Sequence, residues 1–358
     1  MDPEAIQFHP TGIVGPGILA SETLRSVGGI LRNKELEAFM ERYAPKMKEL
    51  APRDLVARAM ETEIREGRGA LSPDHKLEHV WIDLRHLSEY IHDVQIPEVT
   101  SFFRKFVNLD PKKALCPVRP SNHYQMGGIP TNEFGEVGKD AEVVIPGLFA
   151  VGECAAASFH GFNRLGTNSL LELITMGKFA GERAIDYLGD ADVELPSDAG
   201  KKSFSQFSAF MEGQGKDNLG DIRTEMQSLM TEKVGVFRTE SGLNEAIETL
   251  RALKERADKT PLSSPTLTMN QELIQRWELD NLLLLAMVTA QAALNRRESR
   301  GGHYREDFPE RTDEFEYHTL ASMKVFGEVN FDKRSIDMSL YEAKGEHCEK
   351  FGMIERKY

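Results

Sequence analysis

The uneven distribution of glycine and proline is the sequence feature that most constrains the fold of this 358-residue chain. Residues 1–35 and 117–152 are rich in these two residue types, which interrupt regular elements. The second half instead carries stretches in which apolar side chains recur every three or four residues, as they do in amphipathic helices. We therefore expect loops and short strands in the first two regions, and helical segments at about 203–231, 240–257 and 268–295.

Further elements follow from the same patterns. A helix is expected to begin at Arg53, directly after Pro52, and to end near Glu66, because Gly67 and Gly69 follow it. The other expected elements are a helix at 34–50, a strand at Val80–Leu84, strands at Val143–Ile145 and Leu148–Val151, and a helix from Ser169 to about Leu188.

The stretch Gly15–Ala20 matches the glycine pattern of a dinucleotide-binding loop but lacks its context. Such a loop leaves a hydrophobic strand and opens the helix of a βαβ unit. Here Pro10 and Gly12 are expected to keep residues 7–12 out of any regular element. Only a short interval then separates Ala20 from the next pair of glycines. We therefore do not interpret this stretch as a phosphate-binding loop.

Composition argues against several classes of protein. The formal net charge of −13 disfavours a general affinity for nucleic acid or anionic lipid. The longest apolar run, Leu282–Val288, is much shorter than the roughly 20 residues of a membrane span. The three cysteines are far apart and lack C-x-x-C spacing. This spacing argues against a disulfide framework and against a metal or iron–sulfur site built from this sequence.

Three segments place histidine or arginine among glycines and small polar residues: Phe8–Gly12, Ser121–Gly128 and His160–Leu171. Loops of this composition commonly carry function. Taken singly, each histidine is more simply a hydrogen-bonded loop residue. Taken together, two imidazoles, two guanidiniums and a hydroxyl describe a site for a small dianion. A dicarboxylate needs donors at both ends, and arginine binds carboxylate through two parallel hydrogen bonds.

These segments resemble the flavoprotein subunits of succinate dehydrogenase and fumarate reductase, in the FAD-dependent oxidoreductase 2 family. L-Aspartate oxidase is a near relative that is less similar around Met126–Gly128 and Leu165–Thr167. The resemblance covers essentially the whole chain and includes Ala51–Arg58, Ile64–Gly69, Pro146–Glu153 and Glu298–His303.

The resemblance implies an α+β fold. Residues 1–122 resemble a capping domain over the substrate, 123–190 the C-terminal part of an α/β FAD-binding domain, 203–297 a three-helix domain and 298–358 a small C-terminal domain. The resemblance begins just ahead of His9, so the region that resembles the family does not include the family's N-terminal FAD-binding half. Whether that half is encoded upstream, supplied by a separate chain or lost stays open. Without it, we expect exposed strand edges and self-association.

A dicarboxylate site with a proton shuttle is the second implication of the resemblance. Arginine normally keeps its proton up to about pH 12, so an acid role requires a dry, cation-crowded site and groups that reprotonate it. The alternative that the shuttle arginine only binds carboxylate stays open. The residues implied are His9 and Ser21 for one carboxylate, His123 and Arg164 for the other, and Arg53 for proton transfer, relayed through Glu22 and Arg25.

The resemblance also implies FAD as the cofactor. Glu153 would bind the ribityl region, and Ser169 and Leu170 would face the flavin ring from a helix N-terminus. Free N–H groups and the positive end of the helix dipole suit the negative charge of a reduced flavin.

The implied activity is that of an oxidoreductase that interconverts succinate and fumarate by hydride transfer with FAD. Electrons would pass to an iron–sulfur subunit and quinone. Membrane anchor subunits would hold the protein at the inner face of the cell membrane, on the cytoplasmic side, with no nucleic acid as partner. One alternative is a soluble flavoenzyme similar to L-aspartate oxidase, although no segment offers an obvious acceptor for a substrate ammonium. Another is an inactive fragment that needs a separate N-terminal half. The complete set His9, Glu22, Arg53, His123 and Arg164 argues against long decay.

Overall fold

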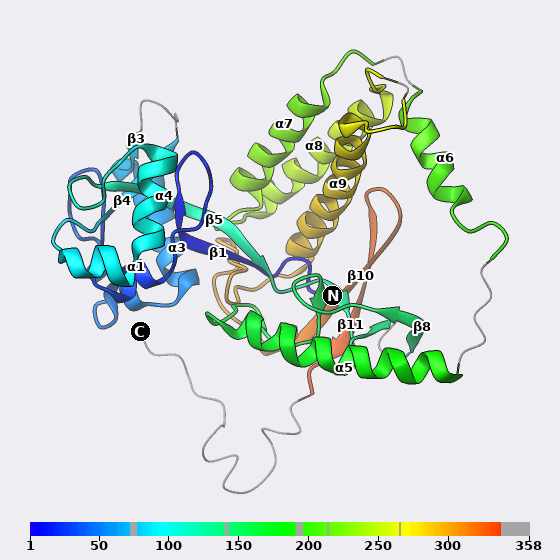
Figure 1. Ribbon diagram of the computed structural model, residues 1–358, viewed down its shortest axis with the longest axis horizontal. Helices are drawn as coiled ribbons and strands as arrows, with labels where there is room; N and C mark the ends of the chain where they lie inside the picture. The colour runs from blue at the N-terminus through cyan, green and yellow to red at the C-terminus, as the bar shows by residue number, and fades with distance from the viewer. Residues whose placement is uncertain (72–76, 140–142, 191–195, 213–214, 265, 338–358) are drawn as a thin grey trace, which may run out of the picture. The chain divides into compact units, whose positions relative to one another are not determined.

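The computed structural model describes residues 1–71, 77–139, 143–190, 196–212, 215–264 and 266–337 (Figure 1). Two compact units are present. Unit 1 contains Met1–Ala5, Gln125–Gly161 and Thr167–Ser335, and unit 2 contains Ile6–Tyr124 and Phe162–Gly166. Helices and sheets both contribute, which confirms the α+β fold class. The assignment of four domains stays a prediction.

Unit 2 is built on a five-stranded sheet in the order β1-β5-β4-β2, with β3 also paired to β4. Strand β4 runs antiparallel to its three partners, and it confirms the strand expected near Val80–Leu84. The strands are β1 (Ile6–Ile13), β2 (Ile30–Arg32), β3 (Ala70–Leu71), β4 (Glu78–Asp83) and β5 (Cys116–Gln125). One side of the sheet contributes to a core that includes Leu31, Val80, Ile82 and Val118.

Strand β1 shows that the expectation for residues 7–12 was wrong. Pro10 and Gly12 lie inside the strand. Strand β1 is at one edge of the sheet. Proline, which has no N–H group to donate, is tolerated in an edge strand because it interrupts no hydrogen bonding between central strands. A glycine is required at position 12 because Ser121 of β5 lies close to its backbone, and an added Cβ atom would overlap the Ser121 Oγ atom.

The Gly15–Ala20 stretch is a turn that folds the chain back on β1. The Ile13 N–H group donates to the Ile18 carbonyl at 2.8 Å, and Gly15 and Gly17 have φ angles of 99° and 68°. The strand before it leads into this turn and not into the helix of a βαβ unit. The stretch therefore lacks the strand–loop–helix context of a phosphate-binding loop, as expected.

The helices of unit 2 agree in part with the sequence pattern. Helix α3 (Arg53–Glu63) begins directly after Pro52, as expected, and continues as a wider turn to Arg68. The helix expected at 34–50 was wrong, because only α2 (Met40–Tyr43) and a short 3₁₀ turn form there. The Asn33 side chain accepts the Glu37 N–H group at 3.0 Å and so favours a turn over a helix. The other helices are α1 (Thr23–Ser26) and α4 (Pro97–Val107).

In the described part of unit 1, three two-stranded sheets form, and the long helix α5 (Asn168–Asp190) starts near the predicted residue. Strand β6 (Ile129–Pro130) pairs in parallel with β9 (Ala155–Ala156), and β7 (Glu136–Gly138) pairs antiparallel with β8 (Val144–Phe149). The two strands expected within 143–151 are thus one strand. Helix α5 (Asn168–Asp190) confirms the helix expected from Ser169. Strands β10 (Tyr317–Val325) and β11 (Glu328–Ser335) form a hairpin.

Four helices fill the region where three helical segments were expected. The segment predicted at 203–231 is two helices, α6 and α7, because the Asn218 side chain accepts N–H groups from Gly220 and Asp221 and starts a new helix. Helices α7, α8 and α9 share a core that includes Leu250 and Leu283. The four helices are α6 (Lys201–Phe210), α7 (Leu219–Lys233), α8 (Glu240–Lys259) and α9 (Gln271–Asn295).

A buried ion cluster ties the first residues of the chain into unit 1. Arg296, directly after α9, donates to Glu4 at 2.6 Å and to Glu298 at 2.9 Å, and all three side chains are fully buried. Nearby, the imidazole of His318 bridges Asp2 and Ser158, at 2.5 and 2.6 Å. A buried ion pair loses much of its value when one partner is removed, because the other charge is left unpaired.

Helix α5 exposes an apolar stripe. Leu170, Ile174, Ile185 and Leu188 are between 60% and 75% exposed and recur at helical spacing. Several side chains of β8, which packs against α5, are exposed as well. A contiguous exposed apolar surface of this kind favours association. In the described part of the chain, no helix is both long and apolar enough to span a bilayer.

We expect the isolated protein to self-associate through the α5 stripe. The double substitution Ile174→Lys and Ile185→Lys should shift the molar mass, measured by light scattering after size-exclusion chromatography, toward that of the monomer. Met269→Lys is the matched control, since Met269 is 91% exposed and lies outside α5. An equal shift in the control, or none in the double variant, would contradict this expectation.

Arg296→Leu should lower the free energy of unfolding by about 3–5 kcal/mol, because it removes the guanidinium that binds buried Glu4 and leaves Glu298 with Arg300 alone. The neighbouring Arg297 is exposed, so Arg297→Leu should change the free energy of unfolding by no more than about 0.5 kcal/mol. Urea unfolding of the two variants checks the difference. Similar losses in both would show that the buried cluster contributes little.

Candidate active site

The seven predicted substrate and proton-transfer residues all belong to unit 2. They come from the sheet, from the starts of two helices and from a short segment that returns to this unit late in the chain. Their positions are His9 on β1, His123 on β5, Ser21 and Glu22 directly before α1, Arg25 on α1, Arg53 at the first residue of α3, and Arg164 in residues 162–166.

One carboxylate joins two guanidiniums. Glu22 accepts from Arg53 through Oε2 at 2.7 Å and from Arg25 through Oε1 at 2.7 Å. Burial raises the pKa of Glu22, but the hydrogen bond from Arg53 and the nearby positive charges outweigh it and hold the pKa below its ordinary value. Burial also lowers the pKa of Arg25. Charge-assisted hydrogen bonds therefore connect Arg53 through Glu22 to Arg25, and the relay of protons along them stays a prediction.

The two imidazoles have defined tautomers. The Thr11 backbone N–H donates to His9 Nδ1 at 3.2 Å, so the proton of neutral His9 lies on Nε2. Arg164 donates through Nη2 to His123 Nε2 at 2.8 Å, so the proton of neutral His123 lies on Nδ1. The rings pack edge to face, with centroids 5.0 Å apart.

Both imidazoles are held neutral. Burial, together with the charge of Arg53 and of other nearby groups, lowers the pKa of His9 to about 2 and that of His123 to about 4. The charge of this cluster then comes from the guanidiniums of Arg25, Arg53 and Arg164 and from Glu22, since the nearby carboxylate of Asp54 is paired with Arg58 at 3.4 Å. The sum is a formal charge of +2. A small dianion would neutralise it.

His9 carries an unpaired donor. Its Nε2 atom is buried and has no hydrogen-bond partner among the residues that the structure describes. Leaving a buried N–H unpaired costs about 1–3 kcal/mol. A carboxylate oxygen of a bound ligand would satisfy this group.

Ser21 is not connected to the other six residues by a hydrogen bond within the described chain. Its Oγ atom lies 3.0 Å from Thr23 Oγ1 and accepts the Thr23 N–H at 3.3 Å. The hydroxyl is half-buried and available to a ligand. Its role in binding a carboxylate stays a prediction.

Sequence reasoning missed three polar residues of the site: Gln7, Asp54 and Asn163. Each is next to, or two residues from, a residue that was predicted. Gln7 donates to Asn163 Oδ1 at 2.8 Å and accepts from Arg53 Nη1 at 2.9 Å. The alternation of side chains along β1 is a signal that could have found Gln7, since residues two apart on a strand share a face with His9.

The three residues predicted to bind the cofactor lie in unit 1. Glu153 is exposed, and one of its carboxylate oxygens accepts the Gln125 N–H at 3.2 Å. Ser169 and Leu170 are in the first turn of α5, and Leu170 is 60% exposed. An exposed carboxylate and a helix N-terminus are groups that fit the hydroxyls and the anionic ring edge of a flavin. Their roles stay predictions.

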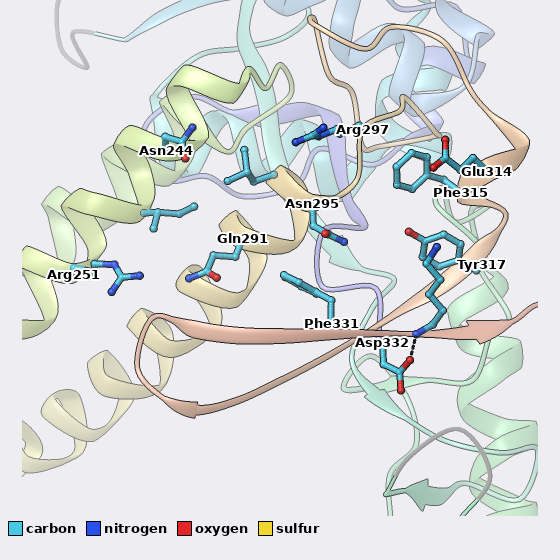
Figure 2. Close-up of a pocket in the computed structure, with 13 residues that line it drawn as sticks. Asn244, Arg251, Gln291, Asn295, Arg297, Glu314, Phe315, Tyr317, Phe331 and Asp332 are labelled. Carbon is cyan, nitrogen blue, oxygen red and sulfur yellow. Dashed lines mark hydrogen bonds between the residues drawn. The ribbon is translucent and has the colours of Figure 1, made fainter.

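A pocket of about 770 Å³ lies elsewhere in unit 1, between α8, α9 and the β10–β11 hairpin (Figure 2). Arg251 and Gln291 reach it from the helices, and Tyr317 and Phe331 reach it from the hairpin. None of the predicted site residues lines this pocket. Its size therefore gives no support to the predicted chemistry, which rests on the charge cluster of unit 2.

We expect the free energy of unfolding to fall as the pH is lowered from 7 to 5. The unfolded chain takes up protons near the ordinary histidine pKa, whereas folded His9 stays neutral down to about pH 2. This difference alone removes about 2 kcal/mol at pH 5. The glutamine of the His9→Gln variant does not titrate, so the free energy of unfolding of this variant should fall less between pH 7 and pH 5. Urea unfolding at both pH values measures the loss, and equal losses in the two proteins would contradict the assignment.

Comparisons with known proteins identify the family of the chain. Residues 1–170 match the family model of the FAD binding domain, and residues 223–358 match the fumarate reductase flavoprotein C-terminal model. The succinate dehydrogenase flavoprotein subunit of Rickettsia bellii is 41% identical over 345 residues, which are 94% of this chain and 57% of the relative. The mitochondrial succinate dehydrogenase (ubiquinone) flavoprotein subunit of Oryza sativa is 42% identical, over 87% of this chain and 50% of the relative.

The fold gives the same result. A solved E. coli quinol fumarate reductase matches with a TM-score of 0.87 and 35% identity, over 94% of this chain and 59% of that chain. The chain thus spans between 50% and 59% of the length of these relatives. It belongs to the family of succinate dehydrogenase and fumarate reductase flavoprotein subunits.

Proposed function

We propose that this chain supplies the dicarboxylate-binding and proton-transfer residues of a flavoprotein that interconverts succinate and fumarate. The observation that carries the proposal is the formal charge of +2 from three buried guanidiniums and one carboxylate, beside the unpaired Nε2 donor of His9. Buried charges need a partner of opposite sign. A small dianion with a carboxylate at each end meets both requirements.

Two pairs of residues bind the carboxylates in this proposal. His9 donates from Nε2 and Ser21 from its hydroxyl to one carboxylate. Arg164 and the Nδ1 proton of His123 bind the other. Holding both ends of a conjugated dicarboxylate by donors draws electron density from its central double bond, and this favours hydride addition in the transition state.

Arg53 moves the proton. Two of its five N–H groups have no partner in the described part of the chain, since the other three are taken by Glu22 and Gln7. In fumarate reduction Arg53 gives a proton to one alkene carbon, and Glu22 and Arg25 return a proton to it. In succinate oxidation the proton moves in the opposite direction. The position of Arg53 at the start of α3 assists proton release, because the helix dipole is positive there.

FAD is the cofactor in this proposal. When bound, it supplies the hydride acceptor and donor. Glu153 would accept hydrogen bonds from ribityl hydroxyls, and Ser169 and Leu170 would offer first-turn N–H groups to the ring. The match of residues 1–170 to the FAD binding domain model supports this assignment.

The partners are proposed from the relatives, whose names describe subunits of succinate dehydrogenase and of fumarate reductase. An iron–sulfur subunit would receive the electrons and pass them to quinone. Membrane anchor subunits would hold the assembly at the inner face of the cell membrane. In this assembly the present chain is a peripheral component.

An L-aspartate oxidase-like activity is less well supported. A substrate ammonium needs an acceptor, and both oxygens of Glu22 already accept from arginine. The curated relatives described above are also succinate dehydrogenase subunits. An inactive fragment that needs a separate N-terminal half would still retain the dianion site, so binding and turnover are separate questions.

Calorimetric titration of the chain with succinate, fumarate, butyrate and L-aspartate tests the proposal. The two dicarboxylates should bind, and butyrate should not, because one carboxylate cannot neutralise the cluster. Arg164→Lys should weaken succinate binding at least tenfold, about 1.4 kcal/mol, since a lysine loses the paired geometry. Arg42→Lys, on a half-exposed arginine, is the control. Tighter binding of L-aspartate than of succinate would favour the alternative.

A further inference from the structure

Gln7 is a buried amide at the junction of the two halves of the charge cluster. Its side chain is on β1, and the residue is 1% exposed. Oε1 accepts from Arg53 Nη1 at 2.9 Å. Nε2 donates to the Arg164 carbonyl at 2.6 Å and to Asn163 Oδ1 at 2.8 Å. One side chain thus contacts both the arginine assigned to proton transfer and the segment that carries the carboxylate-binding arginine.

The contacts of Gln7 belong to a closed circuit of hydrogen bonds. Asn163 Nδ2 donates to Asp54 Oδ1 at 2.8 Å, and Asp54 follows Arg53 in the chain. The circuit therefore runs from Arg53 through Gln7 and Asn163 to Asp54 and returns along the backbone. A guanidinium can only donate and a carboxylate can only accept, so both amides in between have one possible orientation.

From this geometry, we propose that Gln7 is a positioning residue that fixes Arg53 relative to the Arg164 segment. The inference rests on the proposed function, because it assigns Gln7 to the same reaction. Gln7 acts through Arg53, which it contacts directly. It holds Arg53, the proton donor, at a fixed position relative to Arg164, which binds a substrate carboxylate.

The chemistry of position 7 requires an amide and excludes a carboxylate. A neutral oxygen holds Arg53 without a second negative charge, so the guanidinium is not bound more tightly to its proton than Glu22 already binds it. With a glutamate at position 7, two acceptors, the Arg164 carbonyl and Asn163 Oδ1, would face a carboxylate oxygen and not an amide donor. Loss of both donor bonds would release residues 162–166 from β1.

Gln7→Glu and Gln7→Leu test the inference through properties that a purely structural residue would not change. Turnover is measured on the flavoprotein with FAD bound, as a function of pH and in both directions. We expect Gln7→Glu to lower kcat at least tenfold and to shift the pH profile to higher pH, because a second carboxylate holds the Arg53 proton. Gln7→Leu should lower kcat without that shift.

Succinate titration of the chain supplies a readout that does not depend on turnover. Gln7→Leu should weaken binding by roughly threefold to tenfold, since Arg164 loses the support of its backbone but keeps its charge. Gln291→Glu is the matched control. Gln291 is half-buried and, like Gln7, donates to a backbone carbonyl, that of Gly327 at 2.8 Å, but it is in unit 1.

The outcomes separate this inference from the proposed function. If the unmodified chain fails to bind succinate, the proposed function fails. If it binds succinate, and both Gln7 variants keep the original kcat, pH profile and affinity, only the role of Gln7 is overturned. Lower thermal stability in both variants with an unchanged pH profile would likewise assign Gln7 a structural role and overturn the inference. Unchanged pH profile and binding in Gln291→Glu are expected.

Discussion

The excess of guanidinium over carboxylate among Arg25, Arg53, Arg164 and Glu22 is the constraint on which the candidate site depends. Arg25, Arg53 and Arg164 are each less than 10% exposed, and Glu22 is the one carboxylate bonded to two of them. Other N–H groups of the arginines bond to neutral acceptors, which include Gln7 Oε1 and the Ala51 carbonyl. Neutral acceptors satisfy hydrogen bonds without cancelling charge, so the positive field persists for a ligand.

The same positive field explains the state of the two histidines. In an ordinary loop each imidazole would take up a proton near pH 6.5. Burial beside the guanidiniums keeps His9 and His123 neutral, and a neutral imidazole offers one N–H donor in a direction fixed by the bond at its other nitrogen. Charge and hydrogen-bond direction are therefore set by separate groups. The arginines provide the charge, and the histidines provide oriented donors.

Local patterns predicted the elements whose boundaries depend on neighbouring residues. The start of α3 after Pro52 and the start of α5 near Ser169 are examples. The patterns failed where a distant partner decides the conformation. Pro10 is tolerated because β1 is at the end of the sheet, and Gly12 is needed because Ser121 of β5 lies against it. Neither fact can be inferred from the residues next to Pro10 in the sequence.

The candidate site shows the same division. His9, Arg53 and Arg164 could be selected from residue type and from the family resemblance, since histidine and arginine are typical of anion sites. Gln7 could not be selected in this way, because its importance comes from hydrogen bonds to residues 156 and 157 positions away. An amide has no charge and no characteristic spacing. Only the tertiary structure shows that it closes the circuit to Asn163.

The hydrogen-bond donors and acceptors of the cluster also influence which dicarboxylate it would bind. The groups that would face the carboxylates, His9 Nε2 at one end and Arg164 with His123 Nδ1 at the other, are donors, and the carboxylate oxygens of Glu22 both accept from guanidinium. A ligand made of carboxylate oxygens and hydrocarbon meets a donor at each polar end. An amino group on the same carbon skeleton would bring three more donors and a positive charge into a field that is already positive. The cluster should therefore favour a plain four-carbon dicarboxylate over an amino dicarboxylate of the same length.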